Sequence, residues 1–295
     1  MEESKFKSGF VSIVGKPNVG KSTLMNRLVG ERLSIISPKA QTTRHRIMGI
    51  LTGEDYQIVY SDTPGILEPS YSLHQAMMTY VKVSLEDADV ILLVLDGNEK
   101  FDPVLFKRFQ FTQTPLIVLL NKMEKVKKEE EQKIIAHWKE HLPNMASILS
   151  ISALKGKNVD QVFPLIVKYL PVHPPYFPKD DFTNRSERFF AGEIIREKIF
   201  LNYQDEIPYS TEVSITAFKE GDDLIKIQAE IYIERNSQKG ILIGKGGSSL
   251  KKVGTESRLD MEKFFGKKVF LETHVKVASN WRKESHKLRQ FGYFE

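Results

Sequence analysis

Apolar runs of strand length alternate with longer segments of mixed polarity over the first 170 residues. The runs at 90–96 and 115–121 are almost wholly apolar, which is typical of strands covered on both faces. Strands are predicted at 10–14, 47–51, 57–61, 90–96, 115–121 and 147–152. Helices are predicted at 22–29, 127–141 and 159–169. This alternation predicts an α/β domain with a mostly parallel sheet and helices on both faces.

The alternating pattern ends at a proline-rich segment. Pro171, Pro174, Pro175 and Pro178 lie close together, and proline can neither continue a helix nor join a central strand. We therefore expect one domain at 1–170, a linker at 171–185 and a second domain at 186–295. The second domain is predicted to run helix, strand, strand, short helix, glycine-rich turn, helix, strand. Its longer elements are predicted at 187–201, 212–217, 224–233, 249–265 and 268–277, which is an α+β order.

Composition narrows the class of protein. Hydrophobic residues make up 41% and charged residues 27%, which is typical of a globular chain and argues against disorder, collagen or coiled coil. There is no cysteine, which excludes disulfides, thiolate metal sites and cysteine nucleophiles. No apolar run approaches the roughly 18 residues of a membrane-spanning helix. The N-terminus has no apolar signal core, and we expect a cytoplasmic protein.

A phosphate-binding loop is predicted where the first strand meets the first helix. The residues from Gly15 to Ser22 fit the pattern G-x-x-x-x-G-K-[ST], and the strand before and helix after them are the context that this motif requires. Its backbone N–H groups and the helix N-terminus favour phosphate oxygens. Lys21 is expected to reach the β- and γ-phosphates, and Ser22 to bind Mg²⁺. The predicted contacts are Gly15, Lys16, Pro17, Asn18, Val19, Gly20, Lys21, Ser22 and Thr23.

A second motif, Asp62-Thr63-Pro64-Gly65, follows the strand predicted at 57–61. An Asp at the carboxyl end of such a strand can hold Mg²⁺ through water, and the N–H of Gly65 can reach a γ-phosphate. Alone this sequence is a common turn. Its position after a phosphate loop favours a nucleotide contact by these four residues and the next, Ile66.

Two further motifs end the following strands, and with them the chain resembles the translation-factor class of P-loop GTPases. Asn121-Lys122-Met-Glu124 resembles the N-K-x-D element, and Ser152-Ala153-Leu154 the S-A-[KL] element, which together grip guanine. The resemblance implies that Asn121 and Lys122 hold the base and that Ala153 offers an N–H to O6. Glu124 replaces the family's Asp. Its extra methylene either lowers guanine affinity or is accommodated by a shift of the loop.

The resemblance also assigns the switch and the catalytic groups. Segment 37–46 takes the place of the first switch, where Thr43, or next to it Thr42, would bind Mg²⁺ and sense the γ-phosphate. Ile66 stands where Ras-like proteins have a water-orienting Gln, so intrinsic hydrolysis is expected to be slow. Related GTPases with an apolar residue there recruit K⁺ through the Asn equivalent to Asn18. The implied catalytic groups are Lys21, Asn18, Thr43 and Gly65, and the implied metal ligands are Ser22, Thr43 and Asp62.

A glycine loop in the second domain resembles the G-x-x-G clamp of a type II KH domain. Residues 239–291 include 13 basic and 5 acidic residues, a net charge of +8, whereas the whole chain carries +5. A basic face around a glycine loop suits single-stranded RNA, although a solvated surface is the alternative. The predicted RNA contacts are Lys239, Ile243, Gly244, Lys245, Gly246, Gly247, Lys251 and Lys252.

The order of these motifs resembles the Era family, bacterial GTPases of the TrmE–Era–EngA class that carry a C-terminal KH domain. The resemblance implies a GTP-hydrolysing switch that uses Mg²⁺, and potentially K⁺, and binds small-subunit ribosomal RNA near its 3′ end during subunit maturation. It also implies a monomer with weak peripheral association with the inner membrane. Two alternatives stay open: an RNA-binding protein whose nucleotide site is impaired at Glu124, and a phosphotransferase acting on a small molecule. A zinc-protease pattern at His137, Glu140 and His141 is interpreted as a solvated helix face.

Overall fold

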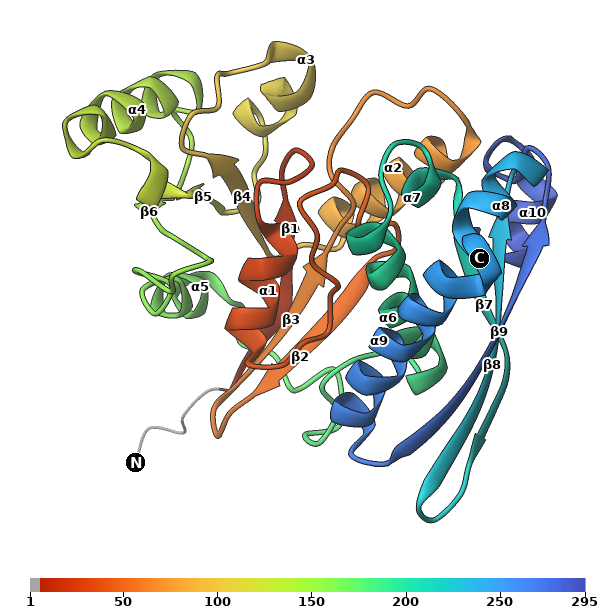
Figure 1. Ribbon diagram of the computed structural model, residues 1–295. Coiled ribbons are helices and arrows are strands. Elements are labelled where there is room, and N and C mark those ends of the chain that lie inside the picture. The colour runs from red at the N-terminus through yellow and green to blue at the C-terminus, as the bar shows by residue number, and fades with distance from the viewer. Residues whose placement is uncertain (1–5, 295) are drawn as a thin grey trace. The chain divides into compact units, whose positions relative to one another are not determined.

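The computed structural model describes residues 6–294 and divides them into two compact units (Figure 1). The first unit comprises residues 6–69 and 77–184, and the second comprises 70–76 and 185–294. Within these residues each unit is built on its own sheet, of six strands in the first and three in the second. No helix in the described part of the chain is long and apolar enough to cross a membrane.

The first sheet has the strand order β2-β3-β1-β4-β5-β6. Its strands are β1 (Lys7–Val14), β2 (Ile47–Thr52), β3 (Tyr56–Asp62), β4 (Val90–Asp96), β5 (Leu116–Asn121) and β6 (Ser147–Ser150). Only the β2–β3 pair is antiparallel among these neighbours. Every residue of β5 is buried, as expected for a strand covered on both faces. The mostly parallel sheet is therefore confirmed.

Helices cover both faces of this sheet, and α1 lies on the opposite face from α2 (Figure 1). The helices are α1 (Lys21–Val29), α2 (Ser72–Glu86), α3 (Pro103–Phe106), α4 (Lys128–His141) and α5 (Val162–Tyr169). The helices α2 and α3 were not predicted from the sequence pattern. A signal for α2 was present, because Met78, Val81 and Leu85 recur at helical spacing and pack into one apolar core with Leu93 of β4.

The proline-rich segment, predicted as a linker, runs along the strands of the first unit. The N–H of Ser8 donates to the Pro171 carbonyl at 3.2 Å, and the N–H of Ile50 donates to the Phe182 carbonyl at 3.0 Å. Between these points lies the fully buried side chain of Gln57. Its Oε1 accepts the N–H groups of Tyr176 and Phe177 at 2.7 and 2.9 Å. Residues 171–182 are therefore held against β1, β3 and β2.

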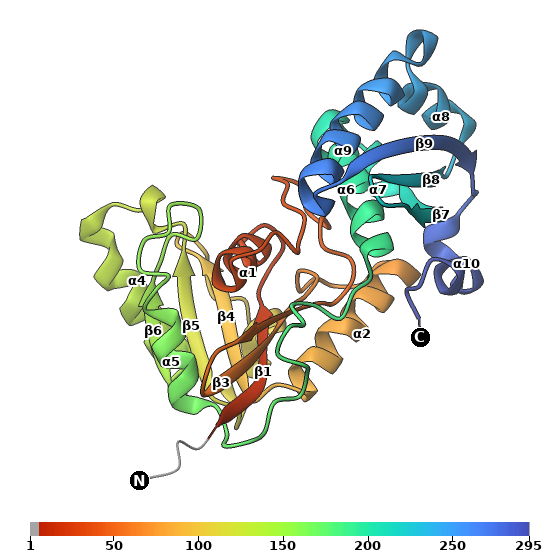
Figure 2. The same ribbon diagram turned by 90° about the horizontal axis from the view of Figure 1, so that it is seen from below.

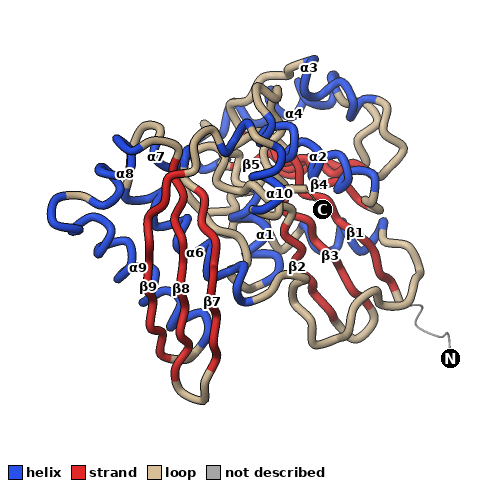
Figure 3. The backbone as a smooth tube through the Cα atoms, turned by 90° about the vertical axis from the view of Figure 1, so that its right-hand side faces the viewer, coloured by secondary structure: helices blue, strands red, loops and turns tan. Residues whose placement is uncertain are grey.

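The second unit has the predicted order of helices and strands, with two short helices added. Its elements are α6 (Glu187–Asn202), α7 (Ile207–Ser210), β7 (Glu212–Glu220), β8 (Leu224–Ile233), α8 (Asn236–Ile243), α9 (Ser248–Phe265), β9 (Lys268–Val277) and α10 (Ser285–Gln290). The strands β7, β8 and β9 lie side by side (Figure 3), with β7–β8 antiparallel and β8–β9 parallel. Alternate residues of β8 are buried against the helices, which Figure 2 shows beside the sheet. This is the α+β order expected of a type II KH fold.

Candidate functional site

The phosphate loop connects β1 directly to α1, as predicted. Gly20 caps α1 with a φ of 100°, a left-handed conformation that favours glycine. A Cβ at this position would lie 2.3 Å from Nδ2 of Asn121, so only glycine also leaves room for that side chain. Two requirements therefore coincide at the second glycine of the motif.

Lys21 is buried, with 5% of its surface exposed. Its Nζ donates to the carbonyls of Gly15 and Lys16, at 3.2 and 2.9 Å, so the ammonium lies inside the curve of its own loop. Burial lowers the pKa of Lys21 to about 8, against the opposing attraction of Asp62 and Glu99. The ammonium group is hydrogen-bonded to neutral carbonyl groups, and a phosphate group would provide a negatively charged partner.

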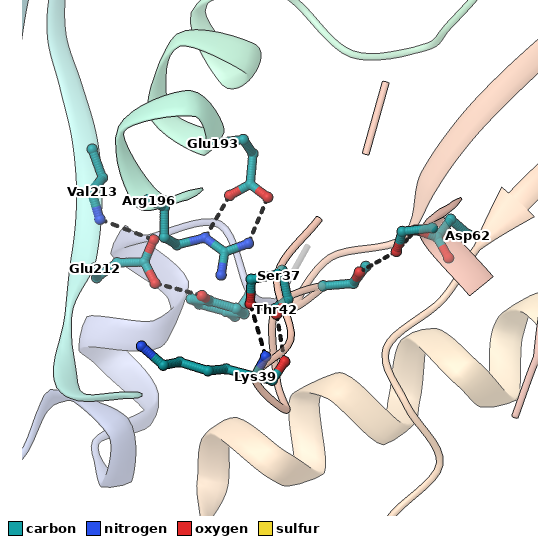
Figure 4. Close-up of polar contacts among 11 residues, drawn as sticks. Ser37, Lys39, Thr42, Asp62, Glu193, Arg196, Glu212 and Val213 are labelled. Atoms are coloured by element: carbon teal, nitrogen blue, oxygen red, sulfur yellow. Dashed lines mark hydrogen bonds and ion pairs between the residues drawn. The ribbon is translucent and has the colours of Figure 1, made fainter. Parts of the chain in front are cut away.

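Three oxygen-bearing side chains, each predicted to bind metal, meet beside this lysine. The Ser22 hydroxyl donates to Oδ2 of Asp62 at 2.6 Å, and it lies 2.8 Å from the hydroxyl of Thr43. Figure 4 shows Asp62 at the end of its strand with a dashed contact to a hydroxyl group. Within residues 6–294 the other carboxylate oxygen, Oδ1, is buried and accepts no hydrogen bond, and burial raises the pKa of Asp62. Hydroxyl and carboxylate oxygens are ligands that suit Mg²⁺, so the donor set fits that ion.

A cavity of about 590 Å³ opens over these groups, a volume suited to a nucleotide. Most of the predicted nucleotide contacts line it: Pro17, Asn18, Gly20, Lys21, Ser22, Thr23, Thr42, Thr43, Gly65, Asn121, Lys122, Glu124, Ala153 and Leu154. The remaining predicted residues are outside its lining: Gly15, Lys16, Val19, Asp62, Thr63, Pro64, Ile66 and Ser152.

Several residues outside the lining support it from behind. Ile66 is 1% exposed and packs into the apolar core, while its N–H donates to the Gly15 carbonyl at 3.0 Å. The Thr63 hydroxyl donates to the Ile13 carbonyl at 2.8 Å. Lys16 forms an ion pair with Glu99, with Nζ 3.2 Å from Oε1. These three residues therefore lie outside the cavity lining, and their contacts stabilise the segments that form it.

The predicted base-binding motifs are tied to each other and to the phosphate loop. The Asn121 side chain donates to the Val19 carbonyl and accepts the N–H of Ala153, both at 2.8 Å. The N–H that the resemblance assigned to guanine is thus used by Asn121 in this structure. The N–H of the next residue, Leu154, has no acceptor among residues 6–294, and Leu154 lines the cavity. Leu154 is therefore a cavity-lining residue of this loop whose backbone N–H is left for a ligand.

The sequence analysis missed part of the cavity wall and its support. Ile35, Ile36 and Lys125 also line the cavity. Asn26, on the last turn of α1, accepts the N–H groups of Leu33 and Ser34 and donates to the Ser34 carbonyl at 2.7 Å. These bonds hold the chain that leads into Ile35. A single Asn near a helix end gives no local signal of such a role, because its partners follow only from the fold.

The glycine loop of the second unit lies between α8 and α9, as predicted. Gly246 has φ 59° and ψ 23°, and no atom outside its own neighbourhood lies within 4 Å of where a Cβ would be. Lys245, Lys251 and Lys252 are exposed, and Lys239 and Ile243 are partly buried. Lys252 lies 3.9 Å from Glu256, whereas Lys239, Lys245 and Lys251 form no ion pair within residues 6–294. The loop is open, and its cations are available to an anionic ligand.

Comparison with known proteins identifies the family. The model of the 50S ribosome-binding GTPase family matches residues 10–122, and the model of the KH domain matches residues 206–282. The curated GTPase Era of Syntrophus aciditrophicus is 44% identical over 295 residues, covering 98% of this chain and 96% of that protein. The chain belongs to the Era family of GTPases.

Two solved Era structures are similar to this chain over its whole length. One is Era in complex with MgGDPNP and nucleotides 1506–1542 of 16S ribosomal RNA, and the other is a variant of Aquifex aeolicus Era bound to GDP and AlF₄⁻. Each has a TM-score of 0.94 and 42% identity, covering 98% of this chain and 100% of the Era chain. The Era family assignment therefore holds in both sequence and fold.

Proposed function

We propose that this Era-family chain is a GTP-hydrolysing molecular switch that binds small-subunit ribosomal RNA through its KH domain during maturation of the subunit. The observation that carries the proposal is the meeting of Ser22 and Thr43, which line the cavity, with Asp62, whose carboxylate accepts the hydrogen bond of Ser22. These residues come from the phosphate loop, the first switch and the end of β3. A γ-phosphate and its metal ion would therefore contact three separate segments of the chain.

The same residues account for hydrolysis. Ser22, Thr43 and Asp62 would hold Mg²⁺, which supplies positive charge to the β- and γ-phosphate oxygens. Lys21 would exchange its bonds to the Gly15 and Lys16 carbonyls for phosphate oxygens. Because Ile66 packs in the core and can neither orient nor activate water, attack by water is slow. We propose that Asn18, which lines the cavity, takes part in binding K⁺ beside the phosphates.

Guanine fits the donors and acceptors at the other end of the cavity. The N–H of Leu154 suits the O6 acceptor of guanine and opposes the N6 amino donor of adenine. Glu124 is exposed and lines the cavity, where its carboxylate can accept hydrogen bonds from N1 and N2 of guanine. We propose that Glu124 retains guanine selectivity in this way despite its extra methylene.

The RNA partner is proposed from the glycine loop and from the Era complex with nucleotides 1506–1542 of 16S ribosomal RNA. An open loop between two helices can approach an RNA backbone closely, and the surrounding lysines can neutralise phosphates. We place the protein in the cytoplasm, where small subunits mature, as a monomer with weak peripheral association with the inner membrane.

Titration of fluorescent GDP into the full chain, with competition by unlabelled GDP, ADP and XDP, tests the nucleotide half of the proposal. Displacement by GDP alone is expected. Lys21→Ala should abolish binding because it removes the buried cation, whereas Lys100→Ala, at an exposed lysine outside the cavity, should bind as the wild type does. Equal displacement by ADP would mean that the base site is relaxed. Absence of GDP binding would favour an RNA-binding protein with an impaired nucleotide site.

A further inference from the structure

Arg27 joins the helix of the phosphate loop to the loop predicted to read the base. It lies one turn from the end of α1, where its Nε donates to the Ala153 carbonyl at 2.8 Å. Its Nη2 donates to the Leu154 carbonyl at 3.1 Å. Arg27 does not line the cavity, whereas Ala153 and Leu154 do. The guanidinium therefore holds this loop on the side away from the cavity.

The hydrogen bond from Arg27 to the Ala153 carbonyl also fixes the direction of the Leu154 N–H, because both groups belong to one planar peptide. The Ala153 carbonyl and the Leu154 N–H belong to one peptide group, and in a trans peptide the two point in opposite directions. No cis peptide occurs within residues 6–294. With the carbonyl bound to Arg27, which lies outside the cavity lining, the N–H of Leu154 points away from the guanidinium. Asn121 holds the preceding peptide through the N–H of Ala153, so this peptide group is fixed from both sides.

We infer that Arg27 is a positioning residue for base recognition, which aims the N–H of Leu154 at the 6-oxo group of the bound base. This inference rests on the proposed guanine-nucleotide function. Because Arg27 lies outside the cavity lining, it would touch neither the phosphates nor the base of a bound nucleotide. Its guanidinium also polarises the peptide that it binds, which makes the N–H on the other end of that peptide a better donor. The role predicts an effect on selectivity and on KM for GTP, with kcat at saturation unchanged.

The test compares two nucleotides that differ at position 6 and, as a consequence, at N1. GDP carries the 6-oxo group and an N1–H donor, and 2-aminopurine riboside 5′-diphosphate lacks both. We expect the wild type to prefer GDP. Arg27→Met should weaken GDP binding about three- to tenfold, the value of one well-placed hydrogen bond, and leave binding of the 2-aminopurine nucleotide unchanged. Arg108→Met, which removes an exposed guanidinium outside the cavity lining, should change neither affinity.

The two Arg27 variants and the wild type together decide whether Arg27 positions the base-reading loop. Arg27→Lys keeps the cation and can hold one carbonyl, so it should retain part of the preference for GDP, and it replaces Arg27→Met as the deciding variant if the latter does not fold. Equal loss of affinity for both nucleotides in Arg27→Met would show a general structural role and overturn the inference, as would full selectivity in both variants. A wild type that binds both nucleotides equally would instead overturn the proposed guanine recognition, and the inference with it.

Discussion

At the scale of single residues, the nucleotide site is defined by buried charge. Lys21 and Asp62 are both buried. Desolvation lowers the pKa of Lys21 and raises the pKa of Asp62, which favours the neutral form of each side chain. The sequence motif predicted that these two side chains contact phosphate and metal. Their burial, and therefore their altered ionisation, depends on the packing of the loop against β1 and β3. A site of this kind responds to pH in a way that an exposed lysine does not.

Binding of GDP without added Mg²⁺ should therefore take up protons at about pH 8.5. Lys21 in the free protein has a pKa of about 8, and a phosphate partner raises it, so binding protonates the lysine. Calorimetry in two buffers of different ionisation enthalpy measures this uptake, which should vanish at about pH 7, where the lysine is already charged.

The same shift affects stability in the absence of nucleotide. The pKa of Lys21 lies below its unfolded value of 10.5, so the unfolded chain binds more protons between about pH 8 and that value. This residue therefore makes the folded state more stable as the pH rises through that window.

Identical heats of GDP binding in both buffers at about pH 8.5 would contradict the buried, partly neutral lysine.

At the scale of helices and strands, the turns between elements hold the groups expected to bind ligands. The loop between α8 and α9 presents Gly246 in a left-handed conformation with open space around it. Asp and Asn tolerate this conformation better than other side chains do. Substitution by either therefore leaves the fold intact and changes only what the loop offers to RNA.

Gly246→Asp should weaken binding of an oligonucleotide from the 3′ end of small-subunit ribosomal RNA about fivefold more than Gly246→Asn does. The two side chains have nearly the same shape, so the difference reports the repulsion between a carboxylate and RNA phosphates, about 1 kcal/mol in water. Fluorescence anisotropy measures the RNA affinity, and GDP titration serves as the control, since neither variant should alter GDP binding. Equal RNA affinity of the two variants would count against this loop as an RNA-backbone clamp.

At the scale of the whole molecule, two units with separate cores are joined by a proline-rich segment that belongs structurally to the first unit. Gln57 makes this attachment. Besides accepting two N–H groups, its Nε2 donates to the Phe177 carbonyl at 2.9 Å. Proline restricts the segment, and the hydrogen bonds of Gln57 satisfy backbone groups that would otherwise be unpaired.

Gln57→Ala should release this segment. The variant loses three hydrogen bonds to the segment and a fourth to Thr52. Loss of the three bonds to the segment is expected to cost about 2–3 kcal/mol and to accelerate chymotrypsin cleavage at Tyr176 and Phe177. Timed digestion with mass spectrometry measures the cleavage, and Gln113→Ala, at an exposed glutamine, is the matched control. Unchanged cleavage at these sites would show that the segment is held without Gln57, by its prolines and by backbone bonds such as that of Ser8 to Pro171.

The sequence by itself determined the strand–helix alternation, the order of elements in the second unit and the positions of the glycine motifs. These features depend on local periodicity and on residues with particular backbone preferences, and both can be found in a linear pattern. Only the tertiary structure decided that Asn26 supports the cavity wall, that Gln57 holds the proline-rich segment and that Arg27 binds the loop of Ala153 and Leu154. The bonds of Asn26 cross the turn that follows α1, and those of Gln57 and Arg27 join segments distant in the chain. Neither kind of contact is encoded in local spacing.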